Sequence, residues 1–511
     1  MSRSLITFGL LLAVGLLGTS GARPQVETGR VKITVVDKAT GKEVPCRIHL
    51  KDAKGKGLKA DKLPFWNDHF VCRGAVVLDL SPGKYTVEIE HGPEYSLSTD
   101  SFTLAPGQTK QLSVALKRLV DMPTKGWWPG DTHVHRAVED VELLMRAEEL
   151  HIAPVITWWN QQNLWAKSTL PEEPLVRFDG NRFYHTMAGE DEREGGALLY
   201  FHLKRPLAIT NATREFPSPL AFAQEARKHT GVWIEAEKPF WWDLPVWVAA
   251  GQVDSLGVAN NHMCRDRMYE TEAWGKPRVV ERYPAPRGNG YWTQDIYYRL
   301  LNCGLRIPPS AGSASGVLPN PVGYNRVYVH VGKELTWEKW WEGLRAGRSF
   351  VTNGPMLLVT ANGKMPGQVF TAGPREAVKV ELKGELITRD AIRWVEIIRD
   401  GEVEMRVSVA EFARTGSLGT LTFTTSGWFL VRAVAENPRT FRFASTAPFY
   451  VEVGDAKRRV SKSAAKFFLE WAKERAERVK LDDAQQREEV LKYHTAAEKF
   501  WGALLERANA E

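Results

Sequence analysis

The pattern of apolar residues changes twice along this chain, and these changes limit what it can fold into. Between residues 29 and 117, short segments alternate apolar and polar side chains with turn residues between them, which predicts a small β-sandwich. Between 126 and 354, apolar strand-like runs alternate with segments of helical periodicity. Such repeated units imply a mainly parallel sheet, and their number favours a barrel. Between 355 and 454 the alternating strands return and predict a second β-sandwich.

The same patterns place the individual elements and predict an α/β fold class. Strands are expected over 31–36, 75–80, 84–90, 111–116, 153–158, 197–203, 232–236, 253–259, 326–330, 378–382, 392–398, 420–423 and 428–435, and helices over 138–150, 219–228, 291–301 and 336–346. Beyond about Ser461, apolar residues at helical spacing predict two antiparallel helices. The predicted divisions are a signal peptide over 1–22, an N-terminal β-sandwich over 23–120, a distorted β/α barrel over 121–355, a C-terminal β-sandwich over 356–454 and a helical hairpin over 455–511.

Composition excludes several classes of protein. The 511 residues are enough for three or four domains, so large cores can form without a metal or a disulfide for stability. A chain with 43% hydrophobic and 25% charged residues is neither globally disordered nor a multi-span membrane protein. The net charge of +7 comes without a basic run, so we expect no nucleic-acid partner. The 19 tryptophans indicate large cores, or flat surfaces that stack on sugars and aromatic rings.

The N-terminus has the features of a secretory signal. Arg3 precedes an apolar run over 5–17, and the small residues Ser20-Gly21-Ala22 follow where a signal peptidase would cut. The run of about 13 residues is shorter than the roughly 20 that span a membrane, and no later segment is long enough. We therefore expect a secreted or periplasmic protein without a transmembrane segment. In that oxidising compartment Cys46 and Cys72 could pair, although four isolated buried thiols explain the sequence equally well.

The segment Gly130-Asp131-Thr132-His133-Val134-His135 carries the strongest chemical signal. On a strand, residues i and i+2 point to one side, so both imidazoles can reach one cation. Asp131 is placed to orient a metal ligand by a hydrogen bond without binding the metal itself. Two histidines in this spacing are weak evidence alone, but their position at the start of a strand–helix series favours a metal site.

Further motifs follow this segment in a definite order. They are the strand over 153–157, the Gly189-Glu190-Asp191 element, the segment before Pro239, residues 304–315, and the run over 347–355. This order resembles the CehA/McbA-type metallohydrolases of the PHP (polymerase and histidinol phosphatase) superfamily, over roughly residues 122–370. The resemblance implies a distorted PHP-like β/α barrel with a two- or three-metal centre that activates water to hydrolyse esters, carbamates or phosphoesters. Residues 81–87 resemble prealbumin-like or carboxypeptidase-regulatory-type accessory domains.

The chain departs from the family pattern at three places. Trp158-Trp159-Asn160 stands where the family usually has Asp-His-Asn, Lys238-Pro239 stands for His-Pro, and residues 312–316 lack the ligands of a Ser-Asp-x-His element. The remaining candidates for metal ligands are His133, His135, Glu190 or Asp191, His202, Glu237 and His262. Three of them with an open fourth position would hold one zinc-type ion, and the expected cofactor is a divalent metal, Zn, Mn or Fe.

Several of these residues also have a purely structural explanation. His202 fits a core histidine as well as a ligand, and the acidic run over 190–194 fits a solvated turn. The two asparagines before His262 fit a turn cap, and Glu237 with Lys238 fits a simple ion pair. The sequence leaves these alternatives open.

Catalytic and substrate-binding roles are assigned by position. Glu237 is expected to transfer protons, and Lys238 to stabilise developing negative charge in aromatic surroundings that exclude water. Predicted substrate contacts are Trp158, Trp159, Trp241, Trp242, Asn325 and Arg326, the last two suited to an anionic or hydroxyl-rich group.

Two functions from different classes fit the sequence. The first is an exported metal-dependent hydrolase that cleaves an ester, carbamate, phosphoester or glycan-type bond in a small-molecule or glycan-like substrate. The second is a barrel that has lost its metals and binds glycans or other envelope polymers, with the tryptophans as its platform. In both, aromatic side chains have replaced part of a metal cluster at the barrel mouth.

Overall fold

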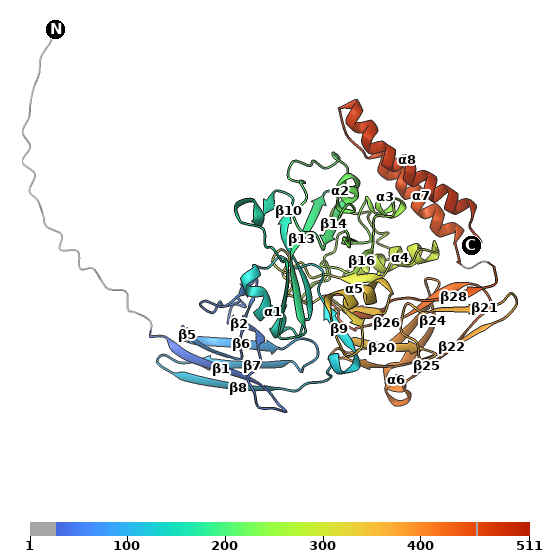
Figure 1. The fold of residues 1–511 in the computed structure, drawn as a ribbon. Helices are drawn as coiled ribbons and strands as arrows, with labels where there is room; N and C mark the ends of the chain where they lie inside the picture. Colours follow the sequence, from blue (N-terminus) through green and yellow to red (C-terminus); the bar gives the residue numbers. More distant parts are fainter. Residues whose placement is uncertain (1–26, 456–457) are drawn as a thin grey trace, which may run out of the picture.

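The computed structural model describes residues 27–455 and 458–511 and shows a mixed α/β protein with more strand than helix. Along the chain, Figure 1 shows a blue β-sandwich, a green central body of strands and helices, an orange sandwich, and a pair of long red helices. The predicted signal peptide over 1–22 lies outside the described residues. Among the described helices, none is long and apolar enough to cross a membrane.

The N-terminal part consists of two sheets around one core. Their orders are β5-β1-β8 and β3-β4-β2-β6-β7. The bounds are β1 Gly29–Asp37, β2 Cys46–Asp52, β3 Phe65–Trp66, β4 His69–Cys72, β5 Ala75–Leu80, β6 Gly83–Glu90, β7 Ser98–Leu104 and β8 Thr109–Leu116. Every second residue of β1 is buried, so the alternation that predicts a strand also builds the core. Cys46 lies opposite Cys72 as a free thiol, with the two sulfurs 3.6 Å apart.

The central strands form a closed ring in the order β9-β10-β13-β14-β15-β16-β17-β18, with β18 next to β9. The bounds are β9 Trp127–Gly130, β10 Ile152–Trp159, β13 Arg182–Arg193, β14 Gly196–Phe201, β15 Trp233–Ala236, β16 Ser255–Ala259, β17 Pro309–Ala311 and β18 Arg326–His330, with the short β11 Gln162–Asn163 and β12 Leu175–Phe178 beside them. Strands β9, β10 and β13 are parallel, and so are β15, β16 and β17. β14 is antiparallel to both neighbours, because a tight hairpin connects it to β13. The sheet is therefore mixed, where the sequence predicted a mainly parallel one.

Short helices connect these strands. The bounds are α1 Val141–Ala147, α2 Pro219–Ala226, α3 Leu244–Ala249, α4 Gly288–Asn302 and α5 Trp337–Arg345. Ser218 caps α2 by accepting a hydrogen bond from the Leu220 amide, and Pro219 occupies the first helical position. The helix predicted over 138–150 is shorter than expected, because Glu149 adopts a positive φ of 51° and turns the chain.

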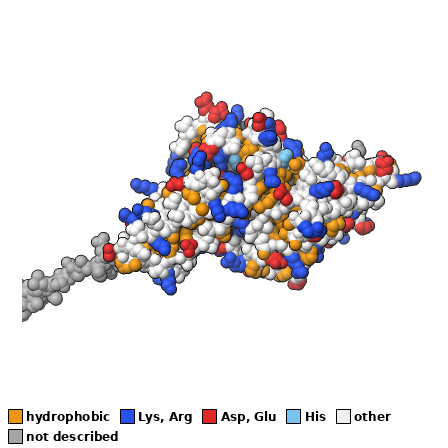
Figure 2. Space-filling view, turned by 90° about the horizontal axis from the view of Figure 1, so that it is seen from below, with side chains coloured by type: hydrophobic (Ala, Val, Ile, Leu, Met, Phe, Trp, Pro, Cys, Tyr) orange, Lys and Arg blue, Asp and Glu red, His pale blue; other side chains and the backbone are white. Residues whose placement is uncertain are grey.

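The second sandwich shares a sheet with the central body. One of its sheets has the order β20-β22-β25, and β19 pairs with β27, which joins the barrel strands to the other sheet. The bounds are β19 Ser349–Thr352, β20 Met356–Ala361, β21 Val369–Ala372, β22 Val378–Ile387, β23 Trp394–Arg399, β24 Glu402–Ser408, α6 Val409–Thr415, β25 Ser417–Phe423, β26 Gly427–Val434, β27 Phe443–Thr446 and β28 Phe449–Val453. On the face in Figure 2, basic and acidic side chains are interspersed with apolar ones.

The two terminal helices, α7 Lys462–Glu477 and α8 Ala484–Glu506, pack on the central body beside α3. Trp501 is fully buried and its indole donates to the Pro245 carbonyl at 2.9 Å. Arg475 is also buried and pairs with Asp243 and Glu215. This buried ion group attaches α7 to the strand–helix body.

We expect Arg475→Ala to lower the free energy of unfolding by about 3–5 kcal/mol, because it leaves two buried carboxylates without their main partner. Denaturant unfolding of the purified protein measures this change. Lys473→Ala is the matched control, since Lys473 is exposed on the same helix. An effect of Arg475→Ala no larger than that of the control would contradict a docking role for the buried arginine.

Candidate metal centre

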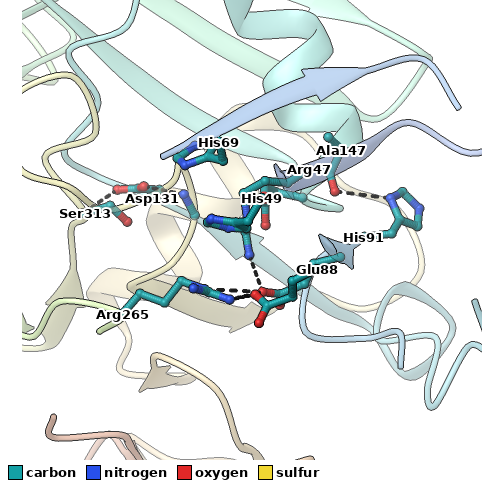
Figure 3. Close-up of polar contacts among 12 residues, drawn as sticks. Arg47, His49, His69, Glu88, His91, Asp131, Ala147, Arg265 and Ser313 are labelled. Carbon is teal, nitrogen blue, oxygen red and sulfur yellow. Dashed lines mark hydrogen bonds and ion pairs between the residues drawn. The ribbon is translucent and has the colours of Figure 1, made fainter. Parts of the chain in front are cut away.

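The loop after β9 is fixed by one carboxylate. Asp131 is fully buried, and its Oδ1 accepts hydrogen bonds from the amides of His133 and Ser313, both at 3.0 Å. Its Oδ2 accepts from the Gly323 amide at 2.7 Å. Figure 3 shows the Asp131 side chain directed at Ser313. Asp131 therefore orients His133 through the backbone and ties three separate segments together at the end of β9.

Close packing behind the histidines explains the small residues of segment 312–316. A Cβ on Gly312 would overlap the Cβ of His133, and one on Gly316 would overlap the His135 carbonyl. Val134 forms bridges to Val155 and Ser315, so the segment between the two histidines is held as a strand on both sides. Because residues i and i+2 of a strand share a face, the two imidazoles point the same way.

Three potential ligand atoms converge in front of this loop. The Nε2 atoms of His133 and His135 are 2.9 Å apart, and Oε2 of Glu190 lies 3.4 and 3.1 Å from them. Ligands bound at 2.0–2.1 Å to a tetrahedral ion are about 3.3 Å apart, which is close to these separations. His133 and Glu190 are each only 2% exposed. The arrangement is a compact, buried group of two imidazoles and one carboxylate.

Glu190 reaches the histidines because β13 continues through it. The acidic run over 190–194 is mostly strand, and only Glu194 and Gly195 turn into β14. Alternation then separates its side chains: Asp191 points away from Glu190 and forms a bidentate pair with Arg193 at 2.7 Å. Asp191 therefore does not join the two histidines and Glu190. Its carboxylate is buried in the ion pair with Arg193.

Glu237 supports His133 from the other side of the ring. Its Oε1 lies 3.3 Å from Nδ1 of His133 and also accepts a hydrogen bond from the Asn261 amide. Its Oε2 pairs with Lys238 and accepts from the Trp241 indole at 3.2 Å. A carboxylate on Nδ1 fixes the imidazole tautomer and directs Nε2 forward, as in carboxylate–histidine–metal arrangements. These contacts favour a positioning role for Glu237 over the predicted proton transfer.

The pKa values of His133, Glu190 and Glu192 are all shifted by the charges of their neighbours. Burial alone would lower the pKa of His133, but Glu190 and Glu237 outweigh it and raise this pKa to about 10. Burial likewise opposes ionisation of Glu190, yet the two histidines bring its pKa down to about 2. Burial and the negative charges of Glu190 and Glu237 raise the pKa of Glu192 to about 8. The raised pKa of Glu192 shows that negative charge accumulates beside Glu190 and Glu237, and a bound cation would stabilise these carboxylates.

His262 lies near Glu237 and Lys238. Its ring packs against Phe240 and Tyr269, with centroids 5.6 and 5.1 Å away, and its amide donates to Asn260 at 3.2 Å. Asn260 thus caps the turn, while Asn261 contacts Glu237. His262 is close enough to Lys238 and Glu237 to interact with their charges, but it is not among the three converging ligands.

His202 is placed in a different environment from the one predicted for a ligand. Its Nδ1 is 2.8 Å from the Gly231 carbonyl, and its ring packs edge-on against Trp341 at 4.6 Å and Trp337 at 5.4 Å. Its φ of 66° turns the chain immediately after β14. The structural alternative for His202, an aromatic-packed histidine, is the one observed.

The predicted substrate contacts separate into two groups. Trp159 borders the ligands, with its ring 5.0 Å from His135 and its indole donating to Glu192 at 3.0 Å. Trp158 points the opposite way and packs on Gly189 and Tyr200, because adjacent residues of β10 face opposite sides. Trp241 is buried under Lys238, whose Nζ is 4.4 Å from its ring.

Trp242, Asn325 and Arg326 do not reach the ligand group. Trp242 packs edge-on against Trp471 of α7. The Asn325 amide donates to the carbonyls of Asn260 and Gly312, and the Arg326 guanidinium donates to backbone carbonyls of Gly323 and Glu148. Both polar side chains satisfy buried backbone groups, a requirement that their sequence positions do not reveal.

Three residues that contact predicted site residues were not singled out from the sequence. Asn261 was considered only as a turn cap, Glu192 only as part of a charged turn, and Trp274 not at all. Trp274 stacks on Trp241 with centroids 6.2 Å apart and is 43% exposed. Glu192 was detectable in principle, because its i+2 spacing from Glu190 places both on one face if the segment is a strand.

A second histidine–carboxylate group lies in the N-terminal sandwich. Nδ1 of His49 and Nδ1 of His69 lie 3.0 and 3.4 Å from the same oxygen of Asp68. Lys51 already pairs with the other oxygen at 2.7 Å, and Arg47 donates to Nε2 of His49 at 3.1 Å. A metal on Nδ1 would require a proton on that Nε2, where Arg47 already donates. This group is better explained as a charge network than as a metal site.

Comparisons with known proteins give no family for this chain. No family model and no curated protein matches it. Among solved structures, it is similar to the Bacillus anthracis TIE protein at 22% identity over 22% of this chain and 20% of that one, with a TM-score of 0.15. It is also similar to the pilus-presented adhesin Cpa at 19% identity over 18% of this chain and 27% of that one, with a TM-score of 0.13. These matches span about a quarter or less of each chain, and no argument rests on them.

The packing of His202 predicts an acid-dependent loss of stability. Burial lowers the pKa of His202 to about 4, so the folded state keeps it neutral where the unfolded chain, with a pKa near 6.5, binds a proton. Its contribution is therefore complete above about pH 6.5 and is lost as pH falls toward 4, by up to about 1.4 kcal/mol per pH unit.

Denaturant unfolding between pH 4.5 and 7.5 measures this slope, and His202→Asn should reduce it. Asparagine tolerates the positive φ and can still donate to the Gly231 carbonyl. The same variant should leave the bound-metal content unchanged. Loss of metal in His202→Asn would restore His202 as a ligand, and an unchanged slope would show that its pKa is not lowered.

Proposed function

We propose that this chain is a metal-dependent hydrolase with a PHP-like barrel, in which His133, His135 and Glu190 hold one divalent ion. The convergence of two Nε2 atoms and one carboxylate oxygen carries this proposal. Two imidazoles and one carboxylate are the protein ligands of many catalytic zinc sites, which leave a further position open to water. The same donor set also accommodates Mn or Fe.

Such an ion, when bound, lowers the pKa of a water molecule to about 7 and so supplies a nucleophile at neutral pH. The residues of the chain prepare the site for it. Asp131 fixes the backbone of His133, and Glu237 holds the ring through Nδ1. Lys238 is buried beside Glu237, and we propose that its ammonium stabilises negative charge that develops on a substrate oxygen.

The aromatic residues at this site support a substrate with a flat or extended surface. Trp159 lies against His135, and the exposed Trp274 extends the stack that begins at Trp241. Indole rings offer broad apolar faces to sugars and aromatic groups. We therefore propose a small-molecule or glycan-like ester, carbamate or phosphoester as the substrate of an exported enzyme.

One observation favours the alternative of a metal-free binding protein. Trp274 is 43% exposed, and a stacked pair of indoles is a suitable platform for a sugar ring. Against it, Trp158 and Trp242 have their faces covered by protein, so most of the predicted platform is part of the core.

The metal proposal predicts that His133→Ala and His135→Ala each lose stoichiometric metal, because each removes one of three ligands. Glu237→Gln should keep the metal but bind it about 10–100-fold more weakly, since it removes the negative charge that lies 3.3 Å from Nδ1 of His133. Elemental analysis of the purified protein and competition with a fluorescent chelator measure both effects.

His49→Gln is the matched control, because it removes a buried histidine from the second group and should leave metal content unchanged. Hydrolysis of a panel of nitrophenyl esters, carbamates and phosphoesters should depend on added metal in the parent protein and disappear in His133→Ala. Full metal content in both alanine variants, or hydrolysis that survives a chelator, would contradict the proposal.

The binding-protein alternative predicts the opposite dependence. Glycan binding should survive metal removal and fall when Trp274→Ala removes the exposed half of the stack. Trp394→Ala is the control, because Trp394 is 38% exposed but belongs to the C-terminal sandwich. A glycan array probed with the metal-free protein decides between the two, and binding only in the metal-loaded state would exclude the alternative.

A further inference from the structure

A small pocket with a cavity volume of about 20 Å³ lies where the two sandwiches meet the central body. The N-terminal sandwich contributes Arg47, and the central body contributes Arg265 and Arg326. Arg389 and Arg442 come from the C-terminal sandwich. Segments from widely separated parts of the sequence thus bring five arginines to the lining of one partly open pocket.

The carboxylates around this cavity are too few to balance the arginines. Glu90 and Glu148 line the cavity. Oxygens of Glu90 lie 2.8 Å from Arg47, 3.0 Å from Arg265 and 2.8 Å from Arg389, so three guanidinium groups share one carboxylate. Figure 3 shows Arg47 and Arg265 directed toward the acidic side chains beside Glu88.

The partners just outside the lining do not complete the balance. Glu88 pairs with Arg265, and Asp390 pairs with Arg442 at 3.0 Å. With these two added, four carboxylates face five guanidinium groups. A buried positive charge without a counter-charge is costly, so an anion at this position would stabilise the assembly of the three parts.

Two further observations point to a missing negative charge. Nη1 of Arg389 is buried and donates no hydrogen bond to the described residues. Burial together with the positive charge of Arg47 lowers the pKa of Arg265 to about 10, and Arg442 adds to this effect. Neighbouring acidic groups outweigh burial and raise the pKa of Arg47 and of Arg442, so the positive charge that the protein does not neutralise is concentrated at Arg265 and Arg389.

We propose that this cavity binds one small oxyanion of the phosphate or sulfate class and that the bound anion links the two sandwiches to the central body. Guanidinium groups provide paired N–H donors that match the oxygens of such an ion. Arg47 and Arg326 are almost completely buried, so a polymer or a peptide cannot reach all five groups. None of the three proposed metal ligands lines this pocket, although Gly323 lines it and donates its amide to Asp131.

The test measures thermal unfolding of the His133→Ala protein in EDTA, so that phosphate bound to a metal cannot contribute. Phosphate or sulfate at 10 mM should raise the Tm by about 2 °C or more relative to chloride at equal ionic strength, because a ligand that binds the folded state stabilises it. The rise should saturate with concentration, and titration calorimetry with inorganic phosphate should give one site per chain.

Arg389→Lys tests the cavity directly, because lysine keeps the charge beside Glu90 but lacks the second terminal nitrogen. Phosphate affinity should fall at least tenfold, while Arg414→Lys, in an exposed pair with Glu411, should bind as the parent does. Arg265→Lys is the second variant if Arg389→Lys does not fold. A Tm rise equal to that in chloride, or unchanged affinity in the cavity variant that folds, would overturn the proposal. Loss of metal binding elsewhere would leave it intact.

Discussion

The buried carboxylate of Asp131 organises the end of the barrel where the ligands meet. It accepts backbone hydrogen bonds from His133, from the segment at Ser313 and from Gly323. Hydrogen bonds to a charged group contribute roughly 1.5–3 kcal/mol each, and a buried carboxylate without them would be strongly destabilising. The loop after β9, the loop after β17 and the approach to β18 therefore depend on one side chain. The histidine pair is positioned only when all three segments are in place.

The same part of the molecule shows what the tryptophans do. Trp158 fills the space over Gly189 and Trp340 packs against Gly130, so large indoles are matched to glycines on neighbouring strands. The Trp340 indole also donates to the Trp128 carbonyl at 2.9 Å. This hydrogen bond satisfies the N–H of Trp340 while its ring is buried. Most of the tryptophan excess thus stabilises the barrel core, and Trp159 and Trp274 remain for a ligand.

Local patterns predicted many elements of the fold but not all of its pairings. The strand over 75–80 and the strand over 326–330 have the predicted bounds, because alternation or a short apolar run is decided by near neighbours. The twelve-residue β13 was not predicted, since its acidic end resembles a solvated turn. That strand carries Glu190, so the error in local structure also obscured the geometry of the third candidate ligand. The antiparallel insertion of β14 was missed for a related reason, because strand direction depends on which distant edge is free.

The sequence alone determined the strand-rich and mixed regions and the i, i+2 spacing that directs His133 and His135 to one side, because these follow from backbone periodicity. Tertiary structure decided which acids and histidines join them. Glu190 and Asp191 differ only in the face of β13 that they occupy, and His202 packs among tryptophans of α5 instead of facing the ligands. The tertiary structure also decided that Arg326, predicted to bind substrate, lines a pocket between three parts of the chain. Distances between segments far apart in sequence are set by how the whole barrel closes, and residue spacing carries no record of them.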